Sequence, residues 1–440
     1  MKFRLIVMNF LEFAVWGAYL TSMGSFLVSV GLEAHIGIFY AMQGIVSIFM
    51  PAIMGIVADR WIPAQKLLGI CHFLAAAFMA GMAAYALTAG EAISFVPAFA
   101  LYAVSVAFYM PTLALSNSVA FTALRMHGLD TEKDFPPIRV FGTIGFIVAM
   151  LLVNFLRIDA GGGLTLSFTA AEGLTSLQVT PYQFVVSAVF GLLLAGYAFT
   201  LPACAVNRGD GGKKGIVEAL GLRAFTLFKE RRMALFFIFS MLLGVSLQIT
   251  NGFANPFITS FQNIPEYAGT WGARNANALI SLSQVSETLC ILLIPFFLKR
   301  FGIKSVMLIA MFAWVLRFGF FGLGNPGGGL WLFVLSMIVY GVAFDFFNIS
   351  GALFVDKETD GNIRSSAQGL FMLMTNGIGA TVGTLGAQAV VNHFVYAHDG
   401  DLAAQAVGWS TSWFIFAGYA LVVAVVFALV FKYRHNPENI

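Results

Sequence analysis

The stretch LWLFVLSMIVYGVAFDFFNISGALFV, residues 330–355, carries a single charged side chain, Asp345. A helix needs about 20 mostly apolar residues to cross roughly 30 Å of hydrocarbon, so this stretch is long enough to span a membrane. Its residues do not alternate between apolar and polar, as the strands of a transmembrane barrel do. The stretch therefore predicts a membrane-spanning helix.

Eleven further stretches of the chain meet the same criterion. They lie near residues 5–30, 36–58, 67–88, 92–115, 137–156, 181–203, 234–259, 275–298, 304–324, 365–392 and 407–432. The first stretch resembles a signal peptide, but it carries Glu12 and lacks a small-residue cleavage site, so we expect it to be retained. The sequence thus predicts an all-α integral membrane protein with twelve transmembrane helices.

The composition excludes several other classes of protein. Of 440 residues, 59% are hydrophobic and 10% are charged, against about 45–50% and about 25% in soluble globular proteins. The chain is also too apolar to be disordered. Its net charge of +3 gives no reason to expect a nucleic-acid partner. Cys71, Cys204 and Cys290 lie far apart and match no metal-ligand spacing, so we expect no metal.

The distribution of Lys and Arg predicts the orientation of the spans. If both termini are cytoplasmic, 20 of the 24 basic residues fall in cytoplasmic segments, as the positive-inside rule requires. The longest cytoplasmic connection then lies between the sixth and seventh spans. We therefore expect an N-terminal six-helix half at 1–204, a linker at 205–232 and a C-terminal six-helix half at 233–440.

A short cytoplasmic turn follows the second span of each half. The first reads GIVADRWIPAQK at 55–66, and the second reads FLKRFGIKS at 297–305. Two similar turns at equivalent places in the two halves are typical of transporters built from two parallel repeats. The first turn resembles the G-x-x-x-D-R-x-x-R/K signature of the major facilitator superfamily, which implies that Asp59 and Arg60 form a conformational latch. Ordinary positive-inside charge explains Arg60 equally well, but it does not explain Asp59.

Ionisable side chains inside spans are costly, by at least about 2.5–3.5 kcal/mol each, and are therefore candidates for function. They are Glu12, His72, Arg139, Glu287, Arg317 and Asp345. Glu287 and Asp345 lie about 18 Å and about 22 Å into their spans, close to the bilayer midplane. We expect His72 and Arg317 to be structural. Glu12 lies only about 10 Å from the inner end of its span, which leaves contact with cytoplasmic water open.

Four spans carry polar or aromatic residues three or four positions apart, which places them on one face of each helix. The groups are Arg139, Thr143 and Phe146; Gln248 and Asn251; Gln284 and Glu287; and Tyr340, Phe344, Asp345 and Asn348. A single Gln or Asn in a membrane helix often bonds only a neighbouring helix. Four such faces, two of them with a carboxylate, favour a water-accessible site instead.

Three long runs carry a family resemblance. They are 134–145, which begins DFPPIR; 236–251, FFIFSMLLGVSLQITN; and 336–351, SMIVYGVAFDFFNISG. They resemble the bacterial nucleoside:proton symporters, the nucleoside permease and xanthosine permease group, and the resemblance extends over essentially the whole chain. One departure is that enteric members carry Gln where this chain has Glu12.

The resemblance implies a major facilitator fold with two pseudo-symmetric halves, and uptake of purine and pyrimidine nucleosides coupled to protons. It also implies a monomer in the bacterial inner membrane that uses the proton gradient and no cofactor. The substrate-site positions that it implies are Arg139, Thr143, Phe146, Gln248, Asn251, Gln284, Glu287, Tyr340, Phe344 and Asp345. The candidates for proton coupling are Asp345, Glu287 and Glu12.

The chemistry of these residues suits a nucleoside. Phe146 and Phe344 can stack on a base, and the Gln and Asn amides can bond base edges or ribose. Arg139 is the one basic residue of the set, which favours a nucleoside over a phosphorylated nucleotide. A carboxyl group that closes into a dry cavity takes up a proton more readily, because burial penalises its charged form.

Three other functions stay open on the residues alone. A sugar or oligosaccharide:proton symporter would also use polar faces with carboxylates. An integral-membrane enzyme would need a catalytic constellation, and the six His residues show no ligand spacing. A gated channel is disfavoured by the twelve spans and the repeat. The resemblance favours a transporter that is not an enzyme.

Overall fold

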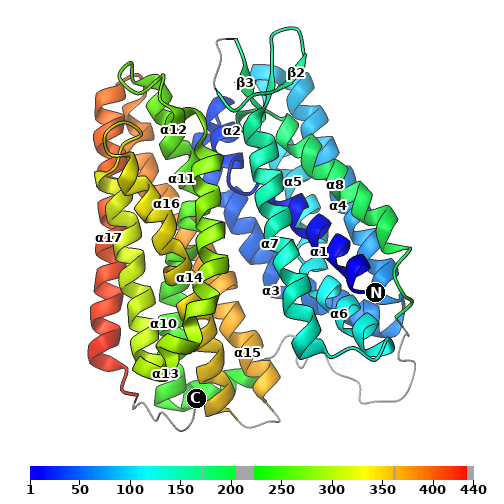
Figure 1. The fold of residues 1–440 in the computed structure, drawn as a ribbon. Helices are drawn as coiled ribbons and strands as arrows, with labels where there is room; N and C mark the ends of the chain where they lie inside the picture. The colour runs from blue at the N-terminus through cyan, green and yellow to red at the C-terminus, as the bar shows by residue number, and fades with distance from the viewer. Residues whose placement is uncertain (170–172, 205–221, 360–362, 434–440) are drawn as a thin grey trace. The chain divides into compact units, whose positions relative to one another are not determined.

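The computed structural model describes residues 1–169, 173–204, 222–359 and 363–433 (Figure 1). Most of the expected linker, residues 205–221 of 205–232, lies outside the described residues. The chain divides into two compact units. Unit 1 comprises Met1–His35 and Ile45–Leu220, and unit 2 comprises Ile36–Gly44 and Gly221–Ile440.

The first six spans are made of eight helices. They are α1 (Lys2–Gly17) with α2 (Met23–Ser29), α3 (Ile36–Arg60), α4 (Ala64–Ala89), α5 (Phe95–Tyr109) with α6 (Thr112–Met126), α7 (Thr131–Phe155) and α8 (Tyr182–Ala198). Two spans are interrupted helices: α1 and α2 are separated by residues 18–22, and α5 and α6 by residues 110–111.

The last six spans follow the same plan. They are α10 (Arg231–Leu247) with α11 (Ile249–Ser260), the two parts of α13 (Ala276–Leu323), α14 (Leu330–Glu358), α15 (Arg364–Met372) joined to α16 (Ala380–Phe394) by a π-helical turn (Leu373–Gly379), and α17 (Leu402–Val430). The short helix α12 (Trp271–Arg274) precedes α13.

Twelve spans can be counted in the described part of the chain. Nine helical segments there are long and apolar enough to cross a membrane. One of them, α13, contains two spans, because Gly302 has a φ of 77° and breaks the helix. Only glycine adopts that conformation readily. The shorter apolar helix α8 and the interrupted pair α1–α2 complete the count. The predicted all-α, twelve-span fold is confirmed.

A small sheet follows α7, in the connection between the predicted spans 137–156 and 181–203 (Figure 1). It consists of β1 (Leu156–Ile158), β2 (Leu164–Leu166) and β3 (Thr175–Ser176), antiparallel in the order β2-β1-β3. Arg157 in β1 is 3% exposed, and its Nε donates to the carbonyl of Ser167 at 3.4 Å. Strands of two or three residues are too short to leave a periodic pattern, so the sequence could not reveal them.

Close backbone approach positions the polar side chains within each unit. In unit 1, a Cβ on Gly145 of α7 would overlap the carbonyl of Phe10 on α1. In unit 2, a Cβ on Gly341 of α14 would overlap the backbone and side chain of Ser286 on α13. Small residues at such crossings let membrane helices pack backbone to backbone. Each crossing lies within one turn of residues that the sequence placed in the site.

Candidate functional site

The carboxyl group of Asp345 is the most deeply buried acidic group of the predicted substrate site. The residue is 5% exposed, and its Oδ2 has no hydrogen-bond partner among the described residues. Almost all buried polar atoms in proteins are satisfied, so an orphaned carboxylate oxygen requires an explanation. A proton or a ligand hydroxyl on Oδ2 would supply the missing bond.

Glu287 is the second acidic group of the same cluster. It is half-buried on α13, and its charge acts on Asp345 on α14. Two carboxylates close together in a poorly solvated place do not both ionise readily, and they titrate as a pair. The two groups are therefore suited to hold one proton between them.

Two aromatic rings on α14 provide a stacking surface. Tyr340 and Phe344 are stacked, with ring centroids 5.6 Å apart and planes inclined by 18°. Trp314 packs its edge against Tyr340 at 6.0 Å, and Phe344 is only half-buried. The side chain of Gln284 interacts with the Tyr340 hydroxyl. Tyr340 is thus fixed by its neighbours, while Phe344 keeps accessible surface.

Arg317 supports this aromatic wall from inside unit 2. Its Cζ lies 4.4 Å from the centroid of Tyr340, and its Nη1 donates to the carbonyl of Ser336 at 2.7 Å and to Ser283 Oγ at 3.3 Å. The residue is 2% exposed. A buried guanidinium over an aromatic face is held by cation–π attraction. Arg317 therefore packs within the protein, as expected from the sequence.

Gln248 and Asn251 form a pair of amides where α10 meets α11. Asn251 Nδ2 donates to Gln248 Oε1 at 2.8 Å, and both residues are half-buried. Gln248 itself lies between the two helices, which end at Leu247 and begin at Ile249. The pairing orients the two amides and leaves Gln248 Nε2 as a donor and Asn251 Oδ1 as an acceptor.

The predicted face of α7 lies in unit 1 and is lined by residues of α1. The Cζ of Arg139 is 3.8 Å from the ring centroid of Phe13. Phe146 is 6% exposed and meets the ring of Trp16 edge-on, with centroids 6.3 Å apart. Thr143 between them is half-buried. Arg139 is therefore held over an aromatic face of α1.

Glu12 and His72 differ from the sequence-based expectation. His72, expected to be structural, pairs with Glu12 of another span: its Nε2 lies 2.8 Å from Glu12 Oε2, and both side chains are 0% exposed. Contact between Glu12 and cytoplasmic water, left open by the sequence, is excluded by this burial. The two residues are 60 positions apart, and spacing along one helix cannot reveal a pair between two helices.

The two residues of the predicted latch lie at the end of α3. Arg60 ends α3 and is exposed, whereas the side chain of Asp59 lies outside the described part of the structure. The latch therefore remains a prediction. Among the described residues, no group of three or more His, Cys, Asp or Glu side chains is placed to hold a metal ion.

Twelve spans with buried polar clusters in each of two units define a secondary transporter of the major facilitator fold. The crystal structure of a D-xylose-proton symporter has the same fold, with a TM-score of 0.66 over 100% of this chain and 98% of that chain. Its sequence is 13% identical, so this likeness bears on the fold alone.

Sequence comparison identifies the family. The profile described as "Nucleoside H+ symporter" matches residues 1–436. The xanthosine permease of Escherichia coli K12 is 46% identical over 440 residues, with 99% of this chain and 97% of the permease covered. The E. coli nucleoside permease NupG is 43% identical over the same shares. A crystal structure of NupG superposes with a TM-score of 0.84 at 42% identity, over 98% of this chain and 99% of that chain. The chain belongs to the nucleoside H+ symporter family.

Membership confirms the resemblance found in the sequence. It supports proton-coupled nucleoside uptake over the sugar-transporter alternative, and it makes the chain a multi-pass protein of the inner membrane.

Proposed function

We propose that this chain imports nucleosides together with protons by alternating access, and that Asp345 and Glu287 carry the coupled proton. The observation that carries the proposal is the buried Oδ2 of Asp345, unpartnered among the described residues, on the helix that also bears the stacked Tyr340 and Phe344. A nucleoside has both of the features that this cluster can recognise, a flat base and hydroxyl groups. The names of the family and of its permeases support the same substrate class.

Different residues would recognise the base and the ribose of the nucleoside. Phe344 keeps exposed surface for the base. The family resemblance adds Phe146, which is 6% exposed in unit 1, as a second aromatic residue for recognition. Stacking of a base on an aromatic side chain contributes about 1–3 kcal/mol and tolerates both purines and pyrimidines. The amides of Gln248, Asn251 and Gln284 would bond base edges or hydroxyls, with Arg139 and Thr143 as further donors.

Coupling would follow from the charge of the carboxyl pair. With both groups ionised, the pair repels itself and resists burial; one proton removes half of that charge. If a nucleoside hydroxyl then donates to the remaining carboxylate, nucleoside and proton stabilise each other's binding, and the effect is reciprocal. The proton leaves on the cytoplasmic side once the nucleoside has left, because the solvated pair ionises again.

The remaining features of the proposal concern the whole chain. The protein would act as a monomer with both termini in the cytoplasm. It would be a transporter that catalyses no reaction and uses no cofactor. Residues 1–204 and 233–440 would be the two moving halves, joined by 205–232. Asp59 and Arg60 would latch neighbouring helices in one state of the cycle.

The test is uptake of labelled uridine, adenosine, xanthosine and lactose into proteoliposomes, with and without an inward proton gradient. We expect saturable nucleoside accumulation that a proton ionophore abolishes, and no lactose signal. Accumulation that ignores the gradient would remove the proton role. Lactose uptake without nucleoside uptake would overturn the substrate class.

A further inference from the structure

A second buried acidic group lies in unit 1, and it is not among the residues assigned to the substrate. Glu12 on α1 and His72 on α4 are both 0% exposed, with 2.8 Å between Oε2 and Nε2. Thr112 Oγ1 on α6 donates to Glu12 Oε1 at 2.6 Å, and the Tyr109 hydroxyl on α5 donates to the Glu12 carbonyl at 2.9 Å. The side chain of Glu12 thus connects α1 to α4 and α6, and its backbone carbonyl connects α1 to α5.

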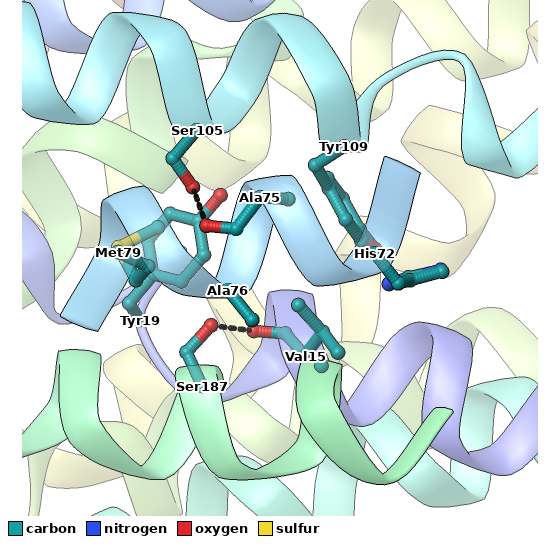
Figure 2. A pocket seen from close by; sticks show the side chains of 10 residues that line it. Val15, Tyr19, His72, Ala75, Ala76, Met79, Ser105, Tyr109 and Ser187 are labelled. Atoms are coloured by element: carbon teal, nitrogen blue, oxygen red, sulfur yellow. Dashed lines mark hydrogen bonds between the residues drawn. The ribbon is translucent and has the colours of Figure 1, made fainter. Parts of the chain in front are cut away.

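The other polar groups nearby do not compete for the pair. His72 and Tyr109 line a small cavity together with Ser105 and Ser187 (Figure 2). Ser105 donates to the carbonyl of Ala75 at 2.7 Å, and Ser187 donates to that of Val15 at 2.8 Å (Figure 2). Both hydroxyl donors are committed to the backbone and do not bond the pair, and the buried Nδ1 of His72 has no hydrogen-bond partner among the described residues.

The 2.8 Å contact is compatible with two protonation states. With a neutral imidazole that donates from Nε2 to a carboxylate, the pair has a net charge of −1. With one more proton the pair is neutral overall, either as carboxylic acid and imidazole or as carboxylate and imidazolium. The distance needs one hydrogen between Oε2 and Nε2 in every case, so the added proton lies on Glu12 Oε1 or on His72 Nδ1, a buried atom that has no hydrogen-bond partner among the described residues.

Burial disfavours a net charge on the pair. A net charge at 0% exposure is costly unless other groups compensate it. The titratable or charged groups that act on this region are Cys71 on α4, Tyr109 on α5, Tyr19 after α1 and Arg139 on α7. Arg139 is the one permanent cation among them, and it lies over the ring of Phe13. Its charge acts on Tyr109, whose hydroxyl donates to the Glu12 carbonyl oxygen.

We propose that Glu12 and His72 form a second proton-binding site, which takes up one proton per pair and is separate from Asp345 and Glu287. Its role in coupling rests on the proposed symport, whereas its titration as a pair does not. Proton uptake converts the net charge of the pair from −1 to zero, and no other bond is made or broken. Unit 1 would then bind a proton at Glu12 and His72, in addition to the proton that unit 2 binds at Asp345 and Glu287.

Infrared difference spectra of the purified protein in lipid test the titration directly. The spectra compare two pH values at which exposed carboxyl groups are already ionised. We expect a carboxyl or imidazolium band in the unaltered protein that Glu12→Gln abolishes and Asp345→Asn retains. His72→Gln should keep a Glu12 carboxyl band and remove any imidazolium band of the pair. If the pH-difference spectrum of Glu12→Gln has the same bands as that of the unaltered protein, the proposal is overturned.

Nucleoside exchange supplies the functional arm, because it needs no net proton movement. Glu12→Gln keeps an acceptor for Thr112 and a donor for His72, so we expect it to fold and exchange with a flattened pH profile. Ser187→Ala, in the same cavity wall, is the matched control and should keep the original profile. Equal profiles for both variants would remove the role in coupling. If the unaltered protein transports no nucleoside, the proposed function fails while the infrared result stands.

Discussion

Gly341 on α14 lies against Ser286 on α13 so closely that a Cβ at Gly341 would sit 2.5 Å from the Ser286 carbonyl oxygen and 2.7 Å from its Oγ. This crossing joins the helix that carries Glu287 to the helix that carries Tyr340 and Asp345. The spacing of the carboxyl pair therefore depends on the absence of a side chain at position 341.

Gly341→Ala is expected to destabilise the protein by about 1–3 kcal/mol, the usual cost of inserting volume into a packed core. The contacted atoms are largely backbone, which cannot move aside alone. Thermal unfolding in detergent measures the effect. The control is Gly319→Ala in the same long helical segment, where an added Cβ meets nothing within 4 Å among the described residues. Equal melting temperatures would show that the two helices can separate at no cost.

The ion pair at the ends of α10 and α14 gives a contrasting prediction. Arg232 Nη1 lies 2.8 Å from Glu358 Oε2, but the Arg232 side chain is 54% exposed. Exposed pairs contribute about 0–1 kcal/mol and are screened by salt. Arg232→Gln should therefore change the free energy of unfolding by less than about 1 kcal/mol, and less still at high salt. A larger, salt-insensitive loss would indicate a role beyond surface charge.

The fold could be read from the sequence because the membrane imposes a strong rule. Runs such as 330–355 must be helical to satisfy their backbone in hydrocarbon, so counting them yields the twelve spans. The break at Gly302 was also foreseeable, since the basic turn 297–305 separates two apolar runs. The sheet after α7 lies outside that rule, and its short strands left no signal.

The site was only partly predictable. Spacing along single helices found the Tyr340–Phe344 face and the Gln248–Asn251 pair, which the structure keeps together. It could not find Glu12 with His72, because their meeting depends on how α1 and α4 pack. The sequence did show that each of two predicted spans contains an ionisable residue, which marks both residues as candidates for function. It did not show that the two residues contact each other.

Phe344→Ala is expected to weaken nucleoside binding by about 5- to 150-fold, the equivalent of one lost base-stacking contact of 1–3 kcal/mol. Phe344→Tyr should keep most of the affinity, because the ring face remains. Equilibrium binding of labelled uridine and adenosine measures both. Phe296→Ala on α13 removes a ring that is 60% exposed and serves as the control. If Phe344→Ala binds nucleosides with unchanged affinity, the base does not stack on Phe344 and must bind at another surface.

Asp345→Asn is expected to abolish proton-driven accumulation while nucleoside exchange persists. The amide keeps the size of the side chain and can still bond a ribose hydroxyl, but it cannot take up and release a proton. Accumulation and counterflow in the same proteoliposomes separate the two activities. Asp401→Asn, which alters a carboxylate that caps the start of α17, should leave both unchanged apart from a small loss of stability. If Asp345→Asn still concentrates nucleoside against its gradient, the proton is carried by Glu287 alone or by the pair in unit 1, and Glu287→Gln and Glu12→Gln then decide between them.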